Sequence, residues 1–219
     1  NDCSTDKTGL ILNKKVNISK KIKTINNENN LGYGNSIKIG IENSKFKNII
    51  ITDADSSYPL ERIPEFYKLF INSNLDMLIG DRSGSFYKYF LSYFSAKNIG
   101  REIVRLLASL LTNYKINDIN SGFRIFRKEM YYKFYDFLPN GFSLTSTITC
   151  LAINFKYKIR FKEIKYSKRI GKSKIKPLRD FINFINLIIK IVIFTKPLRI
   201  FIPLFAFTFL LGIFLMILR

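Results

Sequence analysis

The sequence predicts an α/β domain with a mostly parallel sheet, followed by helices that associate with a membrane. Short runs rich in Ile alternate with helical patterns along most of the chain, and an uncharged run of 19 residues stands near its C-terminus. The 219 residues are 47% hydrophobic, which supports a sizeable core and excludes disorder for most of the chain. Strands that alternate with helices are typical of α/β folds with a largely parallel sheet.

Each element follows from its local pattern. Apolar runs rich in Ile and bounded by turn residues predict strands at 21–26, 48–53, 75–80 and 157–166. Apolar residues at helical spacing predict helices at 33–43, 60–72, 87–112, 128–137 and 144–155. Ligands of such sheets lie beyond the carboxyl ends of the strands, so the residues after each strand are the functional candidates.

The composition limits the chemistry. The chain has no histidine, and its two cysteines are Cys3 and Cys150. A disulfide scaffold, a zinc ribbon and His-based catalysis are therefore excluded. Any acid–base step must use Asp, Glu, Lys or Tyr.

Positive charge is concentrated in one part of the chain. The net charge is +20, and residues 160–199 hold twelve Lys and Arg against Glu163 and Asp180, which is half of that total. Lys, Ile and Asn are abundant together, so an AT-rich genome is one interpretation of the charge. The local concentration favours another, an anionic partner such as phosphate groups, nucleic acid or an acidic membrane face.

The uncharged run at 200–218 predicts a transmembrane helix. At a rise of 1.5 Å per residue it spans roughly 28 Å, close to the thickness of the hydrocarbon core. The alternative is a buried core helix. The cationic block precedes the run, so the positive-inside rule predicts a catalytic domain on the cytoplasmic face. Residues 177–194 predict a membrane-surface helix, with a buried domain helix as the alternative. The predicted divisions are 1–168, 169–197 and 198–219.

Two carboxylates end the second predicted strand. Asp53 and Asp55 are two positions apart in extended chain, so both side chains can face one ligand. Two hard oxygen donors suit Mg²⁺ or Mn²⁺ bridging a diphosphate. A solvated turn is the alternative, but the position at the end of an apolar strand favours the metal site.

Several short motifs occur in an order that resembles family 2 glycosyltransferases. They are Asp2-Cys3-Ser4-Thr5-Asp6-Lys7-Thr8, Asn30-Leu31-Gly32-Tyr33-Gly34, Thr52-Asp53-Ala54-Asp55, Gly80-Asp81-Arg82, Asp118-Ile119-Asn120-Ser121-Gly122-Phe123-Arg124, Leu138-Pro139-Asn140-Gly141-Phe142-Ser143 and Lys168-Arg169-Ile170-Gly171-Lys172-Ser173-Lys174. The chain is most similar to the branch of dolichol-phosphate mannose synthases and bacterial polyprenyl-phosphate glycosyltransferases. The resemblance implies a GT-A-like nucleotide-sugar-binding domain followed by amphipathic and transmembrane helices.

The resemblance also implies roles for single residues. Asp2 corresponds to the carboxylate that holds the nucleotide base, and Asp53 with Asp55 to the metal–diphosphate site. Arg82 and Arg124 correspond to residues around the phosphates. A further set, Arg169, Lys172 and Lys174, corresponds to the basic loop beside the acceptor phosphate.

Two departures from the family pattern put the sugar identity in doubt. Ser57 stands where dolichol-phosphate mannose synthases usually have Gln, and it offers a shorter oxygen ligand to the metal. The carboxylate that often follows the Gly-Phe motif is also absent. The implied reaction type is unaffected.

The expected function is transfer of a sugar from a nucleotide-sugar to a polyprenyl phosphate, with inversion. A phosphate monoester is mostly dianionic at neutral pH and needs no general base, which agrees with the lack of histidine. Two alternatives are transfer to a hydroxyl on a glycan or lipid, with Asp118 as base, and a non-catalytic basic protein tethered to the membrane. The expected partners are the donor, the acceptor and membrane lipid, without nucleic acid.

The resemblance further implies that the chain is a fragment. In the resembled fold two strands precede Asn1, and they lie between the predicted strands 21–26 and 48–53. We therefore expect a sheet with a hole near its centre, and one unpaired edge on strand 48–53 unless 21–26 covers it. Weak nucleotide binding is expected to follow.

Overall fold

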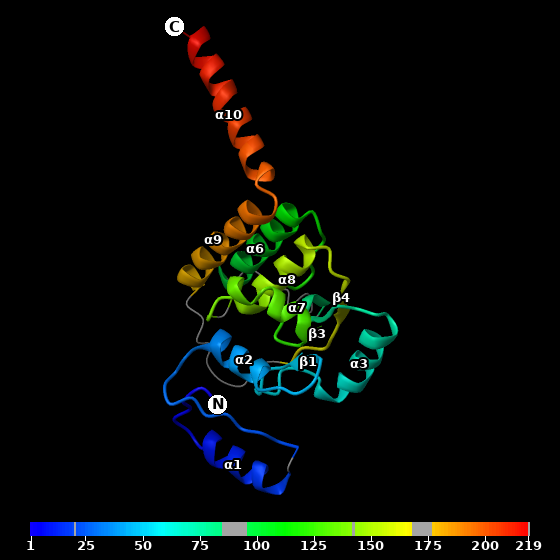
Figure 1. Ribbon diagram of the computed structural model, residues 1–219. Helices are drawn as coiled ribbons and strands as arrows, with labels where there is room; N and C mark the ends of the chain where they lie inside the picture. Colours follow the sequence, from blue (N-terminus) through cyan, green and yellow to red (C-terminus); the bar gives the residue numbers. More distant parts are fainter. Residues whose placement is uncertain (20, 85–95, 142, 168–176, 219) are drawn as a thin grey trace.

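The computed structural model describes all residues except 20, 85–95, 142, 168–176 and 219 (Figure 1). Helices lie on both faces of a four-stranded sheet. In chain order the elements are α1 (Thr8–Ile18), α2 (Tyr33–Glu42), β1 (Asn48–Ile51), η1 (Leu60–Arg62), α3 (Ile63–Asn72), β2 (Met77–Asp81), α6 (Ala96–Thr112), β3 (Arg124–Arg127), α7 (Lys128–Lys133), η2 (Tyr135–Phe137), α8 (Leu144–Asn154), β4 (Ile159–Glu163), α9 (Pro177–Thr195) and α10 (Leu198–Ile217).

The sheet is mixed, so the prediction of a mostly parallel sheet was wrong. The strand order is β1-β3-β2-β4, and β3 runs antiparallel to both β1 and β2, while β2 and β4 are parallel. The sequence did not predict β3. Its first residue, Arg124, pairs with Ile51 near the end of β1 and with Ile79 of β2. The chain thus enters β3 at the edge where β1 and β2 end, and β3 must run in the opposite direction.

The predicted strand 21–26 is absent. Its described residues form no ladder, and the nearest pairing is an isolated bridge between Asp2 and Asn27. Ile22 is exposed, so this segment has no sheet to bury its apolar side chains against. The predicted central hole is also absent, because the four strands are contiguous. Within the described residues β1 lies at the edge of the sheet and pairs only with β3, and 21–26 does not cover it.

Most predicted helices are present with altered bounds. The segment 60–72 begins as the 3-10 turn η1, and 128–137 divides into α7 and η2. The segment 87–112 appears as α6, and its predicted start lies outside the described residues. The sequence did not predict α1, which has no buried residue and therefore lacks the apolar stripe by which helices are recognised.

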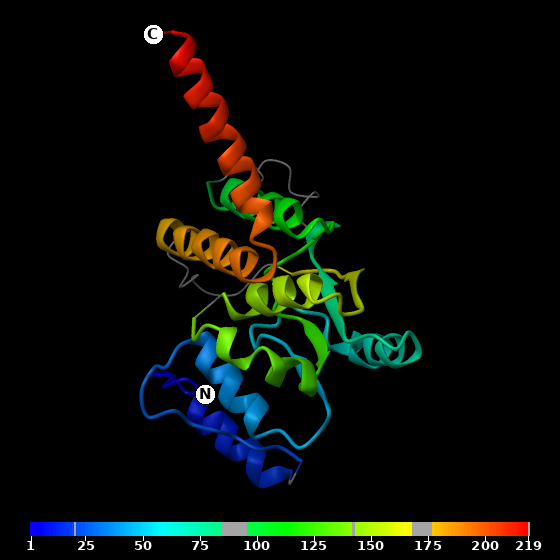
Figure 2. The same cartoon turned by 45° about the horizontal axis from the view of Figure 1, so that its top comes forward.

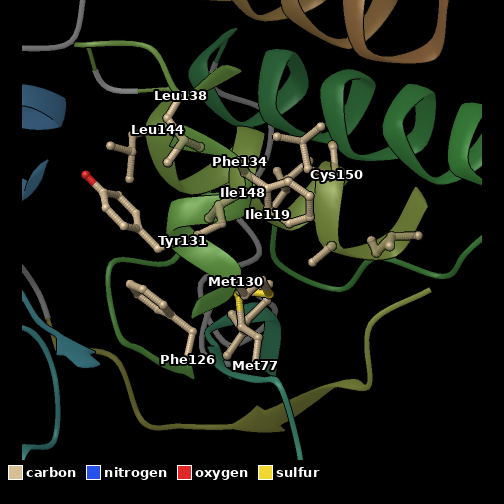
Figure 3. Close-up of a cluster of buried hydrophobic side chains, with 14 of the residues drawn as sticks. Met77, Ile119, Phe126, Met130, Tyr131, Phe134, Leu138, Leu144, Ile148 and Cys150 are labelled. Carbon is tan, nitrogen blue, oxygen red and sulfur yellow. The ribbon is translucent and has the colours of Figure 1, made fainter. Parts of the chain in front are cut away.

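Alternate residues of the strands supply a core on each face of the sheet. Met77 and Phe126 pack with α7 and α8 on one face, where Figure 3 shows the cluster that includes Met130, Phe134 and Ile148. On the other face Leu78 and Ile125 pack with Phe66 and Phe70 of α3. This period of two is what a strand buried on both faces requires.

The two C-terminal helices differ in their surroundings. α9 packs against α6 and α8, whereas α10 extends away from the domain in both views (Figures 1 and 2). α10 has 20 residues, a mean hydropathy of 2.7 and no buried residue. It is long and apolar enough to cross a membrane, and its full exposure rules out the alternative of a core helix within the described structure.

Candidate active site

The candidate site lies at the sheet edge where β1 and β2 end and β3 begins. Asp53 and Asp55 follow β1, Arg82 follows β2, and Asp118 precedes β3. Because β3 is antiparallel, the loop before it joins the loops that follow β1 and β2. The edge therefore collects residues from three separate motifs of the sequence.

The Asp53 carboxylate rests against a glycine. A Cβ atom at Gly122 would lie 2.9 Å from both carboxylate oxygens, which is closer than a nonbonded carbon approaches. Gly122 thus makes room for Asp53 by having no side chain. Asp53 remains partly exposed and can meet a ligand.

Asp55 is oriented by Ser57. The Ser57 backbone N–H donates to Asp55 Oδ1 at 3.1 Å, and the Ser57 hydroxyl donates to the same oxygen. Ser56, between them, has a φ of 58°, which lets the chain turn back on itself. Ser57 is buried, so the structure uses its hydroxyl to hold Asp55 in place.

Arg82 and Asp118 form a buried two-pronged ion pair. Arg82 Nε lies 2.6 Å from Asp118 Oδ2, and Arg82 Nη2 lies 2.9 Å from Oδ1. Burial lowers the pKa of Arg82, but the charge and hydrogen bonds of Asp118 outweigh it, so the net direction is upward. Arg82 also donates to the Tyr58 hydroxyl at 3.3 Å and stacks over the Tyr166 ring.

Arg124 is buried in a different way. Its guanidinium is 0% exposed and donates to Ser121 O, Thr145 O at 2.6 Å and Thr149 Oγ1 at 3.1 Å. These acceptors are neutral, and burial lowers its pKa to about 10. The structure therefore places Arg124 beneath the site, where it ties the start of β3 to α8.

Asp2 holds the turn that begins α2. Its carboxylate accepts the backbone N–H groups of Leu31 at 2.8 Å and Gly32 at 2.9 Å, and the side-chain amide of Asn27. Burial raises the carboxyl pKa, but these hydrogen bonds lower it below its ordinary value. The next residue, Tyr33, has a raised pKa because of burial and the nearby charge of Asp53.

The structure does not describe part of the predicted site. Arg169, Lys172 and Lys174 lie outside the described residues. The point where their loop begins is described: the Ser167 backbone N–H donates to Ser57 O at 3.0 Å. Among the described residues there is no group of three or more acidic or Cys side chains placed to hold a metal.

Sequence reasoning missed three residues of the site. Tyr58 accepts the Gly122 backbone N–H at 2.8 Å through its hydroxyl, Tyr33 stands near Asp53, and Gly122 makes room for it. Burial raises the pKa of Tyr58, so its hydroxyl stays protonated. Tyr33 and Gly122 lay within recognised motifs but had bland readings as turn residues. Tyr58, beside Pro59, gave no signal in the sequence.

Comparison with known proteins now gives the family. The description "Glycosyl transferase family 2" matches residues 1–134. The chain belongs to this family. It is similar to a dolichyl-phosphate hexose transferase of Haloferax volcanii, with 27% identity over 146 residues, which cover 67% of this chain and 61% of the relative. An uncharacterized protein of Methanocaldococcus jannaschii is 29% identical over 136 residues, 58% of each chain. The glycosyltransferase chain thus spans about three fifths of the length of these relatives.

Solved structures confirm a GT-A-like α/β fold. Glucosyl-3-phosphoglycerate synthase from Mycobacterium tuberculosis, in complex with phosphoglyceric acid, has a TM-score of 0.57 and 12% identity, and the match covers 88% of this chain and 65% of that one. S. aureus TarS 1-349 in complex with UDP-GlcNAc has a TM-score of 0.57 and 18% identity, with coverage of 89% and 56%. At these identities the likeness shows the fold of the glycosyltransferase.

Proposed function

We propose that this glycosyltransferase moves a sugar from a nucleotide-sugar to a polyprenyl phosphate at a membrane, with inversion at the anomeric carbon. The observation that carries the proposal is the bond from Ser167 N–H to Ser57 O, which fastens the start of the basic segment 168–174 to the turn that bears Asp55. A cluster of lysines and arginines thus begins at the carboxylate pair. The name of the Haloferax volcanii relative and the UDP-GlcNAc bound to S. aureus TarS support acceptor and donor classes of this kind.

The proposed reaction needs no general base. An oxygen of the acceptor phosphate, mostly dianionic at neutral pH, forms a bond to the anomeric carbon from one face. The bond from that carbon to the diphosphate oxygen breaks on the other face, and its electron pair leaves with the nucleoside diphosphate. The protein must relieve the repulsion between two anionic groups, which is the role we assign to Arg82 and to the basic segment.

The donor set at Asp53 and Asp55 fits Mg²⁺ or Mn²⁺. Both carboxylates are partly exposed at the end of β1, and a divalent ion of this type takes one or two carboxylates and completes its shell with phosphate and water. When bound, the ion would neutralise charge on the departing diphosphate. Ser57 would act through Asp55, since its hydroxyl already donates to that carboxylate.

The exposed apolar surface supports membrane attachment. α10 supplies a helix of spanning length, and large apolar side chains are exposed near its base on α6 and α9, namely Leu106, Leu110, Ile193 and Phe194. These two helices pack against each other, so the side chains belong to one part of the domain. We assign the domain to the cytoplasmic face on the basis of the cationic residues that precede α10.

The structure favours a phosphate acceptor over a hydroxyl acceptor. A hydroxyl would need a carboxylate base, and the candidate, Asp118, has a 3% exposed side chain and directs both oxygens to Arg82. A carboxylate in this position is not available to take a proton from an acceptor.

Incubation of membranes that carry the full chain with labelled nucleotide-sugars tests the function. We expect one label to enter the organic phase, to be released by mild acid, and to stay aqueous with EDTA or with Asp55→Asn. The amide introduced by Asp55→Asn keeps an oxygen for Ser57, so the variant should fold normally. A lipid product that resists mild acid would indicate a hydroxyl acceptor. Full transfer in EDTA, or by Asp55→Asn with Mn²⁺, would refute the metal assignment.

A further inference from the structure

Two motifs that the reaction leaves without a role meet in the structure. The residues 30–34 lead into α2, and the residues 138–143 lead into α8. The Asn35 backbone N–H, in the first turn of α2, donates to Asn140 O at 3.1 Å. A Cβ atom at Gly34 would lie 2.6 Å from Pro139 O and from the Asn140 carbonyl carbon. The loop therefore lies directly against the helix backbone.

A buried lysine joins the same two segments. The buried residues of α2 are Gly34, Lys38 and Ile41, so Lys38 stands in the middle of the face that packs inward. It is 8% exposed, and its ammonium donates to Leu138 O at 2.5 Å and to Asn140 Oδ1 at 2.9 Å. A buried charge is costly unless it is hydrogen-bonded, so its presence on this face indicates that the contact is specific.

We propose that Lys38 is a positioning residue of this glycosyltransferase, which fastens the loop 138–140 to α2 and thereby fixes both walls of the donor site. This role in catalysis rests on the proposed function. The contact itself does not.

Two short routes lead from the clamp to the site. On one side, α2 begins at Tyr33, one residue before Gly34, and Tyr33 stands near Asp53. On the other side, the loop continues into α8, where Thr145 O accepts from Arg124.

Arg124 also donates to Ser121 O, and the next residue is Gly122, against which Asp53 rests. Loss of the clamp should therefore displace groups on both sides of Asp53. Misplacement of a catalytic group by about 1 Å can cost up to about a hundredfold in rate.

The first experiment removes the ammonium. Lys38→Met, Lys38→Arg and the exposed helical control Lys68→Met are compared in the full chain by hydrogen exchange and by steady-state kinetics. In Lys38→Met we expect faster exchange in peptides covering 33–41 and 138–147, unchanged exchange in β2, and a loss of about tenfold or more in kcat/KM for the donor. Lys38→Arg should restore most of both, and Lys68→Met should match the parent.

The second experiment loosens the same contact without touching the lysine. Gly34→Ala places a methyl group against the loop backbone, whereas Gly40→Ala on the same helix meets nothing within 4 Å. We expect Gly34→Ala to reproduce the exchange and kinetic changes of Lys38→Met. Gly40→Ala should leave both unchanged and should not lower stability.

The outcomes separate the clamp from the proposed function. Unchanged exchange in Lys38→Met, or faster exchange with an unchanged donor kcat and KM, would overturn the positioning role. If the parent chain transfers no sugar, the proposed function fails, and the clamp is then supported or overturned by exchange alone.

Discussion

Two buried arginines at the same edge of the sheet are held by opposite means. Arg82 is neutralised by Asp118 in a two-pronged ion pair, whereas Arg124 donates to neutral oxygens of Ser121, Thr145 and Thr149. The first arrangement holds a cation at the rim of the site, and the second places a cation beneath it. Both arginines were predicted to lie around phosphates, and of the two only Arg82 has a side chain with any exposure, at 11%.

The ion pair gives a prediction for Asp118→Asn. Removal of one partner leaves a buried charge, so the free energy of unfolding should fall by about 3 kcal/mol. Activity should fall with stability and show no new dependence on pH, because Asp118 is not a base in the proposed reaction. Denaturant unfolding and a pH–rate profile are the measurements.

The double variant Arg82→Met with Asp118→Asn supplies the control, read by unfolding alone. It leaves no unpaired charge, so it should be less destabilised than Asp118→Asn. A rate that collapses in Asp118→Asn and recovers at high pH would instead indicate base catalysis and a hydroxyl acceptor.

Asp2 gives a prediction about acid stability. Its carboxyl pKa is below the ordinary value of 3.8 because hydrogen bonds from Asn27, Leu31 and Gly32 outweigh burial. A carboxyl with a lowered folded pKa stabilises the fold above its unfolded pKa, and this contribution is lost as the pH falls through the folded pKa.

Urea unfolding between pH 3 and pH 6, a range around the unfolded value of about 4, measures the effect. The free energy of unfolding should fall less steeply with acid in Asp2→Asn than in the parent. The exposed control Glu61→Gln should follow the parent curve. Identical slopes for Asp2→Asn and the parent would contradict the assignment.

At the scale of elements, β2 is the strand with the least free space. A Cβ atom at Gly80 would lie 2.7 Å from Phe123 Cδ1 and 2.9 Å from Ile164 Cδ1. Gly80→Ala should therefore lower the free energy of unfolding by about 1–3 kcal/mol through overpacking. Gly141→Ala, where nothing lies within 4 Å, is the matched control for thermal unfolding. Equal stability of the two variants would mean that Phe123 and Ile164 can move aside freely.

The sequence predicted the strands that are apolar runs and missed the one that is not. The segments 48–53, 75–80 and 157–166 contain β1, β2 and β4, because buried strands read as runs of apolar residues. β3 has four residues, with an arginine at each end, and its place between β1 and β2 depends on contacts far apart in the chain. The mixed sheet therefore could not be predicted from local pattern.

The candidate site was predictable where motifs carry charge. Asp53, Asp55, Arg82 and Asp118 do lie at one edge of the sheet. The role of Lys38 could not be predicted, because a lysine on a helix is usually solvated and only the fold shows that its face is buried. Tyr58 was missed for a related reason, since its hydroxyl meets Gly122, 64 residues later.

For the whole molecule, α10 sets the relation between the domain and the membrane. A helix of 20 apolar residues that buries nothing in the domain should hold the chain in a bilayer. Leu210→Arg combined with Phe207→Arg places two charges near the helix centre, at about 2.5–3.5 kcal/mol each. The variant should be released by alkaline carbonate, whereas the parent and Leu210→Ala combined with Phe207→Ala should stay with the membranes. Retention of the Arg variant would show that α10 is not the anchor.

The antiparallel strand also fixes the order in which the molecule can be completed. β1 and β2 leave the ribosome one after the other, yet each needs β3 as a neighbour, and Ile51 cannot pair until Arg124 has been made. Contacts of such long range close slowly because a long loop must be ordered first. The edge that carries Asp53 and Asp55 therefore takes shape only after Arg127 has been made, and α10 is synthesised later still. The strand that joins the two halves of the sheet is thus also the step after which the catalytic edge exists.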